Sequence, residues 1–268
     1  MSMQQELKKE MSRMSSQRSE KITCPGCGKE HDFEMWNSLN TMLDPDMKEK
    51  LLSKEMFQFV CPDCGYTENV DYGFLYHQME DRIMIYYIQD EDEIEKTIKM
   101  ITGEAYDSFE LSEALQKAKR EYLYRIVLSQ NDLLEKIHIF DNGRDDRMIE
   151  IMKVLMTGWI MSDHPESEPF HIFYDSDDED EFFVLVGESD IIGAVELLEE
   201  LYDAINDEYE DKFAPLKGSD EYVIDFDWAA DFLGIDQAIY ESEKEIEDGA
   251  EALDAHEVFS ELDEKHFS

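Results

Sequence analysis

The residues with the clearest capacity for chemistry in this chain are four cysteines in two similar pentapeptides. The pentapeptides read Cys24-Pro25-Gly26-Cys27-Gly28 and Cys61-Pro62-Asp63-Cys64-Gly65. They contain every cysteine of the sequence, and 33 residues lie between Cys27 and Cys61. Two thiolates three positions apart suit one small ion, while the proline fixes a backbone angle and the final glycine permits the positive φ that closes the loop. Two such loops predict a tetrahedral Cys₄ site, which most often holds structural zinc.

Disulfide bonding, thiol redox chemistry and iron binding are the other uses of these cysteines. The opening residues MSMQQELKKEMSRMSSQRSE lack the apolar stretch of a secretory signal, so we expect the chain in the reducing cytosol, where disulfides are rare. A thioredoxin-type pair usually occurs once, beside a βαβ pattern, whereas this chain has two copies. Iron stays open, since the run from Cys61 to Tyr66 also suits a rubredoxin-like Fe–S₄ centre. Structural zinc is favoured over iron, and no open position for a hydrolytic metal is indicated.

The charge of the chain is extreme and uneven. Its formal net charge is −43; residues 163–268 hold 36 Asp and Glu against 4 Lys and Arg, and residues 1–162 hold 31 against 20. Even residues 20–80, which include the cysteines, have 12 acidic against 5 basic side chains. Such surfaces repel phosphates, so nucleic-acid binding is not expected. An acidic surface most often serves solubility. The more specific interpretation is that the surface binds a basic protein partner or mimics nucleic acid.

Motifs of the common enzyme classes are missing from the sequence. It has no H-E-x-x-H, no G-x-S-x-G and no phosphate-binding glycine loop. The acidic run 175–181 lacks the glycine and glutamate that an EF-hand loop needs, so a solvated hairpin tip is expected there. The sequence contains no run of eighteen apolar residues, so no membrane-spanning helix is predicted. Five histidines are scattered and are assigned to surface or strand positions: His31, His77, His138, His164 and His171. We therefore expect a non-enzymatic protein.

The elements that must position the cysteines follow from apolar periodicity and from turn residues. Strands are expected beside both loops and directly downstream of them, at residues 21–23, 31–36, 56–60, 70–74 and 83–88. Together they are expected to form a small antiparallel sheet. Further strands are expected at 122–128, 170–174, 182–186 and 222–224. Helices are expected at 45–52, 91–101, 109–121, 132–139, 145–161, 191–209 and 227–233. Trp159 lies in an apolar helix stripe and is assigned to the core.

The two Cys-Pro-x-Cys loops and the segments around them resemble the bacterial CpXC domain, a family named for this motif. The residues that carry the resemblance begin with the four cysteines, Leu51-Leu52, Phe57–Val60 and Leu75–His77, and continue at Arg125–Val127, Leu134–Asp141 and Asp145–Glu150. The resemblance covers most of residues 20–160. It implies that the four paired cysteines hold a metal, and it implies no activity.

These patterns together predict an α+β protein in two folded parts. A zinc-ribbon-like antiparallel β module with one inserted helix spans residues 20–104, and an acidic α+β domain spans 105–235. Residues 1–19 are expected to be a mobile lead-in and residues 236–268 an acidic tail. The expected function is that of a cytoplasmic protein-interaction or regulatory adaptor, with Zn²⁺ held by Cys24, Cys27, Cys61 and Cys64. A rubredoxin-like iron electron carrier is the alternative.

Overall fold

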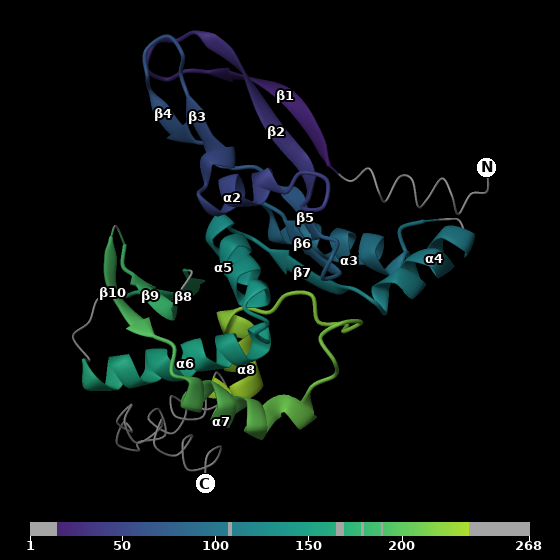
Figure 1. Ribbon diagram of the computed structural model, residues 1–268, viewed down its shortest axis with the longest axis vertical. Helices are drawn as coiled ribbons and strands as arrows, with labels where there is room; N and C mark the ends of the chain where they lie inside the picture. Colours follow the sequence, from purple (N-terminus) through teal and green to yellow (C-terminus); the bar gives the residue numbers. More distant parts are fainter. Residues whose placement is uncertain (1–14, 107–108, 165–168, 178–179, 189, 236–268) are drawn as a thin grey trace, which may run out of the picture. The chain divides into compact units, whose positions relative to one another are not determined.

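The computed structural model describes residues 15–106, 109–164, 169–177, 180–188 and 190–235, which form an α+β fold (Figure 1). The chain divides into two compact units. Unit 1 contains the residues up to 134 together with Pro215–Tyr222, and unit 2 contains Glu135–Ala214 and the residues from 223 onward. The border expected between residues 104 and 105 lies inside unit 1. Strand β1 begins at Ser16, within the expected lead-in, while residues 1–14 and the expected tail 236–268 lie outside the described residues.

The described part of unit 1 is built around a mixed sheet whose five strands lie in the order β1-β2-β5-β6-β7. Their bounds are β1 (Ser16–Thr23), β2 (Glu30–Asn40), β5 (Phe74–Gln78), β6 (Ile83–Tyr87) and β7 (Leu123–Val127). β1/β2 and β5/β6 pair antiparallel, whereas β2/β5 and β6/β7 pair parallel. The expectation of a purely antiparallel sheet was therefore wrong. Long connections that contain helices separate both parallel pairs in the chain, and such crossovers permit parallel pairing.

The remaining elements of unit 1 include the segment between the two cysteine loops. That segment contains α2 (Asp46–Leu52) and η1 (Glu55–Phe57), and the second loop joins the hairpin strands β3 (Gln58–Val60) and β4 (Thr67–Asn69). Between β6 and β7 lie η2 (Glu91–Glu93), α3 (Ile94–Thr102) and α4 (Phe109–Lys119). β6 is almost wholly buried, which its run of apolar residues on both faces predicted.

The described part of unit 2 packs helices against a three-stranded antiparallel sheet of order β10-β9-β8. The strands are β8 (His171–Ser176), β9 (Glu181–Val186) and β10 (Ile191–Glu196). The helices are α6 (Asp146–Asp163), α7 (Glu199–Tyr209), η3 (Glu210–Lys212) and α8 (Phe226–Leu233), while α5 (Gln130–Asp141) crosses the border between the units. The core of the unit forms where the long buried helix α6 meets β8, β9, α7 and α8.

Three sequence predictions in this region were wrong. The helix expected over 191–209 begins only at Glu199, because Ile191–Glu196 pairs with β9 as a strand. Its β-branched residues fit a pleated sheet, and Gly193 weakens a helix there. Trp159 is 42% exposed rather than part of the core. No strand forms at residues 222–224, although the Tyr222 carbonyl accepts a hydrogen bond from the backbone N–H of Ile126 at 2.8 Å.

Unit 2 also contains a buried network of five charged side chains on α5 and α6. Lys136 lies 3.1 Å from Asp146 and 2.8 Å from Glu150, and Lys153 lies 3.0 Å from Glu135 and 2.8 Å from Glu150. All five residues are at most 5% exposed. Three carboxylates against two ammonium groups leave an excess of one negative charge, so the network becomes neutral when one carboxylate keeps its proton.

Glu135 is the carboxylate whose protonation we expect to affect stability between pH 4.5 and 7. Burial raises its pKa to about 7, above the value of an exposed Glu, despite Lys153 beside it and the Tyr174 N–H that it accepts at 2.6 Å. Between pH 4.5 and 7 the native state therefore keeps a proton on Glu135 that the unfolded state has lost. The free energy of unfolding falls as pH rises through this range, by up to about 3 kcal/mol. Glu135→Gln is expected to flatten this decline in urea unfolding, whereas exposed Glu208→Gln keeps it. An unchanged pH profile of Glu135→Gln would argue against the shift.

Candidate metal centre

Each cysteine pair occupies the tip of a β-hairpin, and the two tips have the same backbone structure. In the β1–β2 hairpin, the Cys24 N–H donates to the Lys29 carbonyl at 2.9 Å and the Gly28 N–H donates to the Cys24 carbonyl at 2.8 Å. In the β3–β4 hairpin, Cys61 bonds to the Tyr66 carbonyl at 2.8 Å and Gly65 to the Cys61 carbonyl at 2.9 Å. The glycines have φ values of +73° and +72°. Similar sequences thus give the same closed loop twice.

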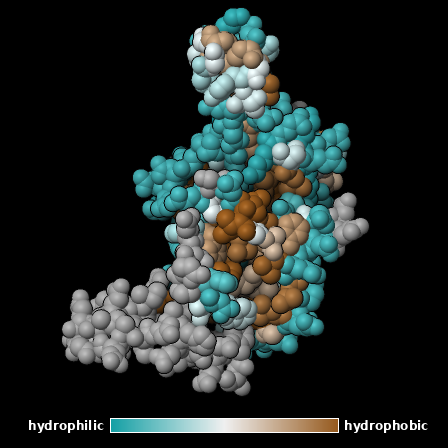
Figure 2. All heavy atoms as spheres, turned by 90° about the vertical axis from the view of Figure 1, so that its left-hand side faces the viewer, coloured by the Kyte–Doolittle hydropathy of each residue, from teal (hydrophilic) through white to brown (hydrophobic). Residues whose placement is uncertain are grey.

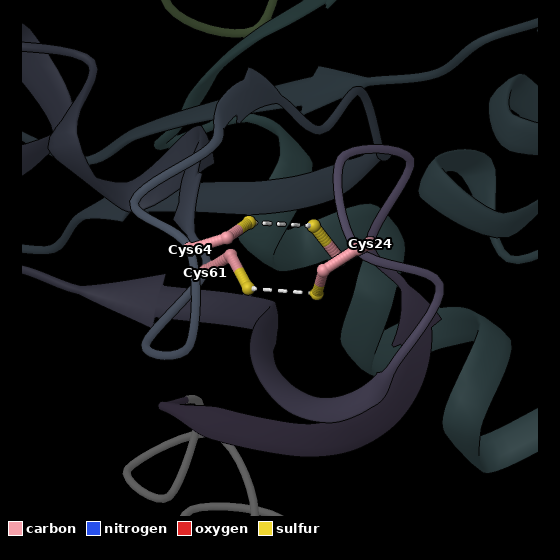
Figure 3. A group of neighbouring side chains, drawn as sticks. Cys24, Cys61 and Cys64 are labelled. Carbon is pink, nitrogen blue, oxygen red and sulfur yellow. Dashed lines mark hydrogen bonds between the residues drawn. The ribbon is translucent and has the colours of Figure 1, made fainter.

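The two loops bring the four sulfurs together, as Figure 3 shows for the labelled Cys24, Cys61 and Cys64. The Sγ atoms of Cys24 and Cys64 are 3.6 Å apart, those of Cys27 and Cys61 are 3.7 Å apart, and all four lie within 4.8 Å of one another. Four Zn–S bonds of about 2.3 Å in a tetrahedron place sulfurs about 3.8 Å apart, whereas a disulfide needs about 2 Å. The cysteines are therefore free thiols with the spacing of a shared four-sulfur ion site.

Apolar packing beneath the sulfurs holds the two hairpins together. Cys24 and Cys61 are buried with Phe59, and Ile22 and Phe33 pack against this small cluster. The rings of Phe33 on β2 and Phe59 on β3 meet edge to face, with centroids 6.1 Å apart. Cys27 and Cys64 lie on the exposed side of the site. The cluster is too small to hold the tips rigidly by apolar burial alone, so an ion at the sulfurs would be the main link between them.

The thiols of Cys61 and Cys64 have pKa values shifted in opposite directions from that of an ordinary cysteine. Burial raises the pKa of Cys61, but the backbone N–H groups of Cys64 and Asp63 outweigh that effect and lower it to about 6. The Tyr66 N–H lowers the pKa of Cys64, yet burial and the other cysteines raise it to about 12. Once one thiolate has formed, its neighbours resist ionisation, and a divalent cation would remove that repulsion.

Sequence reasoning missed three polar neighbours of the sulfurs. His31 places Nε2 3.4 Å from the Cys61 sulfur and 3.4 Å from a carboxylate oxygen of Asp63. The Lys29 ammonium contacts the same carboxylate at 2.7 Å, which links the first loop to the second. For two of them, the available clue in the sequence was their closeness to the cysteines. Lys29 follows Cys27 by two residues, and Asp63 lies between Cys61 and Cys64.

Two other histidines, His77 and His138, have polar partners other than the sulfurs. His77 is buried, with its ring nitrogens 3.4 Å from the Asn40 amide and 3.3 Å from the Tyr122 hydroxyl, and its burial lowers its pKa to about 4. His138 bonds to Ser176 at 3.0 Å. The assignment of His31 and His77 to strand positions is confirmed, since they lie on β2 and β5.

Loss of the Lys29–Asp63 ion pair is expected to have a small effect. Asp63→Asn keeps the size of the side chain and removes its charge, and both partners are substantially exposed, so the free energy of unfolding should fall only slightly. Metal content per chain should be unchanged. Urea unfolding and elemental analysis measure the two quantities. Loss of metal from this variant would assign Asp63 a direct part in holding the ion.

Substitution of a loop glycine is expected to cost more, because of backbone strain. An alanine Cβ at Gly65 meets nothing within 4 Å, but φ of +72° is unfavourable for any residue with a Cβ. Gly65→Ala should therefore lower stability by about 1–2 kcal/mol in urea unfolding. Gly193→Ala is the matched control, because it also has open space but no positive φ, and it should be nearly neutral. Equal effects at the two positions would contradict the strain argument.

One comparison with known proteins, that with protein-family models, found a match. Residues 22–153 match the model of a protein family described as CpXC protein, and this range includes all four cysteines. No curated protein and no solved structure matches the chain. In the part of the chain that the structure describes, none of the helices has the length and apolar character needed to cross a membrane.

Proposed function

Because residues 22–153 belong to the CpXC family, we propose that this protein is a zinc-stapled adaptor. One structural Zn²⁺, held by Cys24, Cys27, Cys61 and Cys64, joins the tips of two hairpins into a zinc-ribbon-like module with α2 inserted between the loops. The observation that carries the proposal is the spacing of the four sulfurs in two loops of the same backbone structure. Four sulfur ligands complete a tetrahedron and leave no position for a substrate, which is typical of structural zinc.

The second part of the proposal is a non-enzymatic role in the cytoplasm. A metal site closed by four thiolates supplies folding energy rather than chemistry, and thiolates persist in a reducing compartment. The strongly acidic surface suits a protein partner with basic residues, and it disfavours nucleic acid and anionic membranes.

Elemental analysis of protein purified without added metals tests the zinc assignment. We expect one zinc per chain, a colourless protein and no iron. One iron per chain with a red colour would replace the proposal with its alternative, the rubredoxin-like electron carrier. Absence of both metals at the four cysteines would end both proposals. Affinity capture from the natural host, with the full chain as bait, tests the adaptor role, and basic proteins are the expected partners.

A further inference from the structure

An apolar groove opens on unit 2 between α6 and the segment formed by β10 and the start of α7. Its volume is about 200 Å³. Met156, Trp159 and Ile160 of α6 line one side, and Val195, Leu198 and Leu201 line the other. Figure 2 shows hydrophobic side chains gathered on one face of the molecule. The groove is built wholly within unit 2.

Large apolar side chains remain exposed on the elements that form this groove. Trp159 is 42% exposed and Leu198 is 56% exposed. Ile191 and Ile192, on the strand β10 at the edge of the described sheet, are 70% and 58% exposed. Contiguous exposed apolar surface, including an apolar edge strand, is typical of an interaction site.

The charge around the groove restricts what can bind there. The sequence has no Lys or Arg from residue 154 to residue 211, and it has nineteen Asp and Glu in that span. Glu196 lines the groove, and Glu199 and Glu200 are exposed at the start of α7. Arg144 is already engaged, since its guanidinium pairs with Glu181 at 2.7 Å and with Glu199. The rim of the groove is therefore acidic.

We propose that this groove binds a basic amphipathic helix of a partner protein. The apolar residues of that helix, spaced i, i+3 and i+4, would enter the groove beside Trp159, and its flanking Lys or Arg would face Glu196 and Glu200. A second copy of the chain is disfavoured, because each copy carries a net charge of −43. An anionic membrane is disfavoured by the same charge. The inference rests on the adaptor role proposed above and names the surface that carries it.

A synthetic peptide of about 18 residues, five helical turns, provides the probe. It contains only Leu and Lys, with Leu on one helical face, and carries a fluorescent label for anisotropy titration against the full zinc-loaded chain. We expect binding that weakens as salt is added. Two control peptides, one with Glu in place of Lys and one with the same composition in scrambled order, should bind at least tenfold more weakly. Equal binding of either control would overturn the proposal, as would no binding of the probe.

Protein variants locate the binding. Trp159→Gln and Leu198→Ser should each weaken peptide binding about tenfold or more, as expected for residues at the centre of an interface. Leu198 is the N-cap residue of α7, a position where Ser is favoured, so this variant should fold. Leu43→Ser is the matched control, since Leu43 is 50% exposed on unit 1 and should leave binding unchanged.

Because none of these substitutions changes the charge of the protein, unchanged binding of Trp159→Gln and Leu198→Ser would show that the peptide recognises only overall charge. That result would overturn the groove assignment, as would equal losses in all three variants. Zinc content is measured on every sample. Stoichiometric zinc without peptide binding refutes the groove alone, whereas absent zinc with intact, groove-dependent binding refutes the zinc assignment alone.

Discussion

Cys61→Ser is expected to abolish stoichiometric metal binding and to lower the stability of the hairpin region of unit 1 by more than about 3 kcal/mol. The magnitude follows from structural zinc, which contributes apparent binding energies of about 10–16 kcal/mol in small zinc modules. Three remaining thiolates leave one position of the tetrahedron without a sulfur ligand, and the sulfur lost is one of the two buried in the small cluster with Phe59. Elemental analysis and urea unfolding measure the two effects.

Chelation of the wild-type protein should reproduce the effect of Cys61→Ser. Hydrogen exchange is the sharper readout, because it reports each region separately. Amides of β1–β4 should lose protection, while amides of α6, in the core of unit 2, should keep most of theirs. Asp63→Asn is the control, since it alters the same loop without removing a ligand sulfur. Loss of protection in α6 equal to that in β1–β4 would count against separate cores, and retained protection everywhere would count against a structural ion.

Lys153→Met is expected to destabilise unit 2 by about 3–5 kcal/mol, the second-largest effect. The ammonium of Lys153 lies 3.0 Å from Glu135 and 2.8 Å from Glu150, and the side chains of all three residues are at most 6% exposed. Methionine fills much of the same space but leaves the ionised Glu150, and above pH 7 the ionised Glu135 as well, without this cation. An uncompensated buried charge costs about this much. Burial lowers the pKa of Lys153, but the two carboxylates outweigh burial and raise it, so the native state holds the charged form.

An exposed pair provides the control for this prediction. Lys212 contacts Glu208 at 2.7 Å on the surface, and Lys212→Met should cost less than about 1 kcal/mol. The double variant Glu135→Gln/Lys153→Met should regain part of the loss, because it removes one of the stranded carboxylates together with the ammonium. Urea unfolding of the wild type, Glu135→Gln, Lys153→Met and the double variant gives the coupling energy between Glu135 and Lys153. Equal costs for Lys153→Met and Lys212→Met would show that the buried network contributes no more than a surface pair.

Local sequence was sufficient for features that depend on a few neighbouring residues. The repeated Cys-Pro-x-Cys-Gly pattern predicted two tight loops, and the structure forms both with the same hydrogen bonds and the same positive φ at glycine. Helical periodicity predicted α6, and a short continuous run of apolar residues predicted β6 as a buried strand. The meeting of the four sulfurs was also predictable, because two half-sites of this type need each other to complete a tetrahedron.

The buried charges of α6 had a signal in the sequence that was not used. Asp146, Glu150 and Lys153 recur at helical spacing in a helix whose other positions are apolar nearly all round. A helix that is apolar all round is buried, so its charged residues must be buried with it and must find partners. The partners Glu135 and Lys136 lie on α5, and only the packing of two helices could identify them.

Other features depended on contacts between distant segments, which local patterns do not encode. Ile191–Glu196 has apolar residues compatible with a helix, but pairing with β9 makes it a strand. Parallel pairing of β2 with β5 depends on how the chain returns after the second hairpin. Trp159 belongs to an apolar stripe, yet its exposure depends on what the rest of unit 2 leaves uncovered. His31 became a neighbour of Cys61 for the same reason: their contact joins residues 30 positions apart, and only the folded chain brings them together.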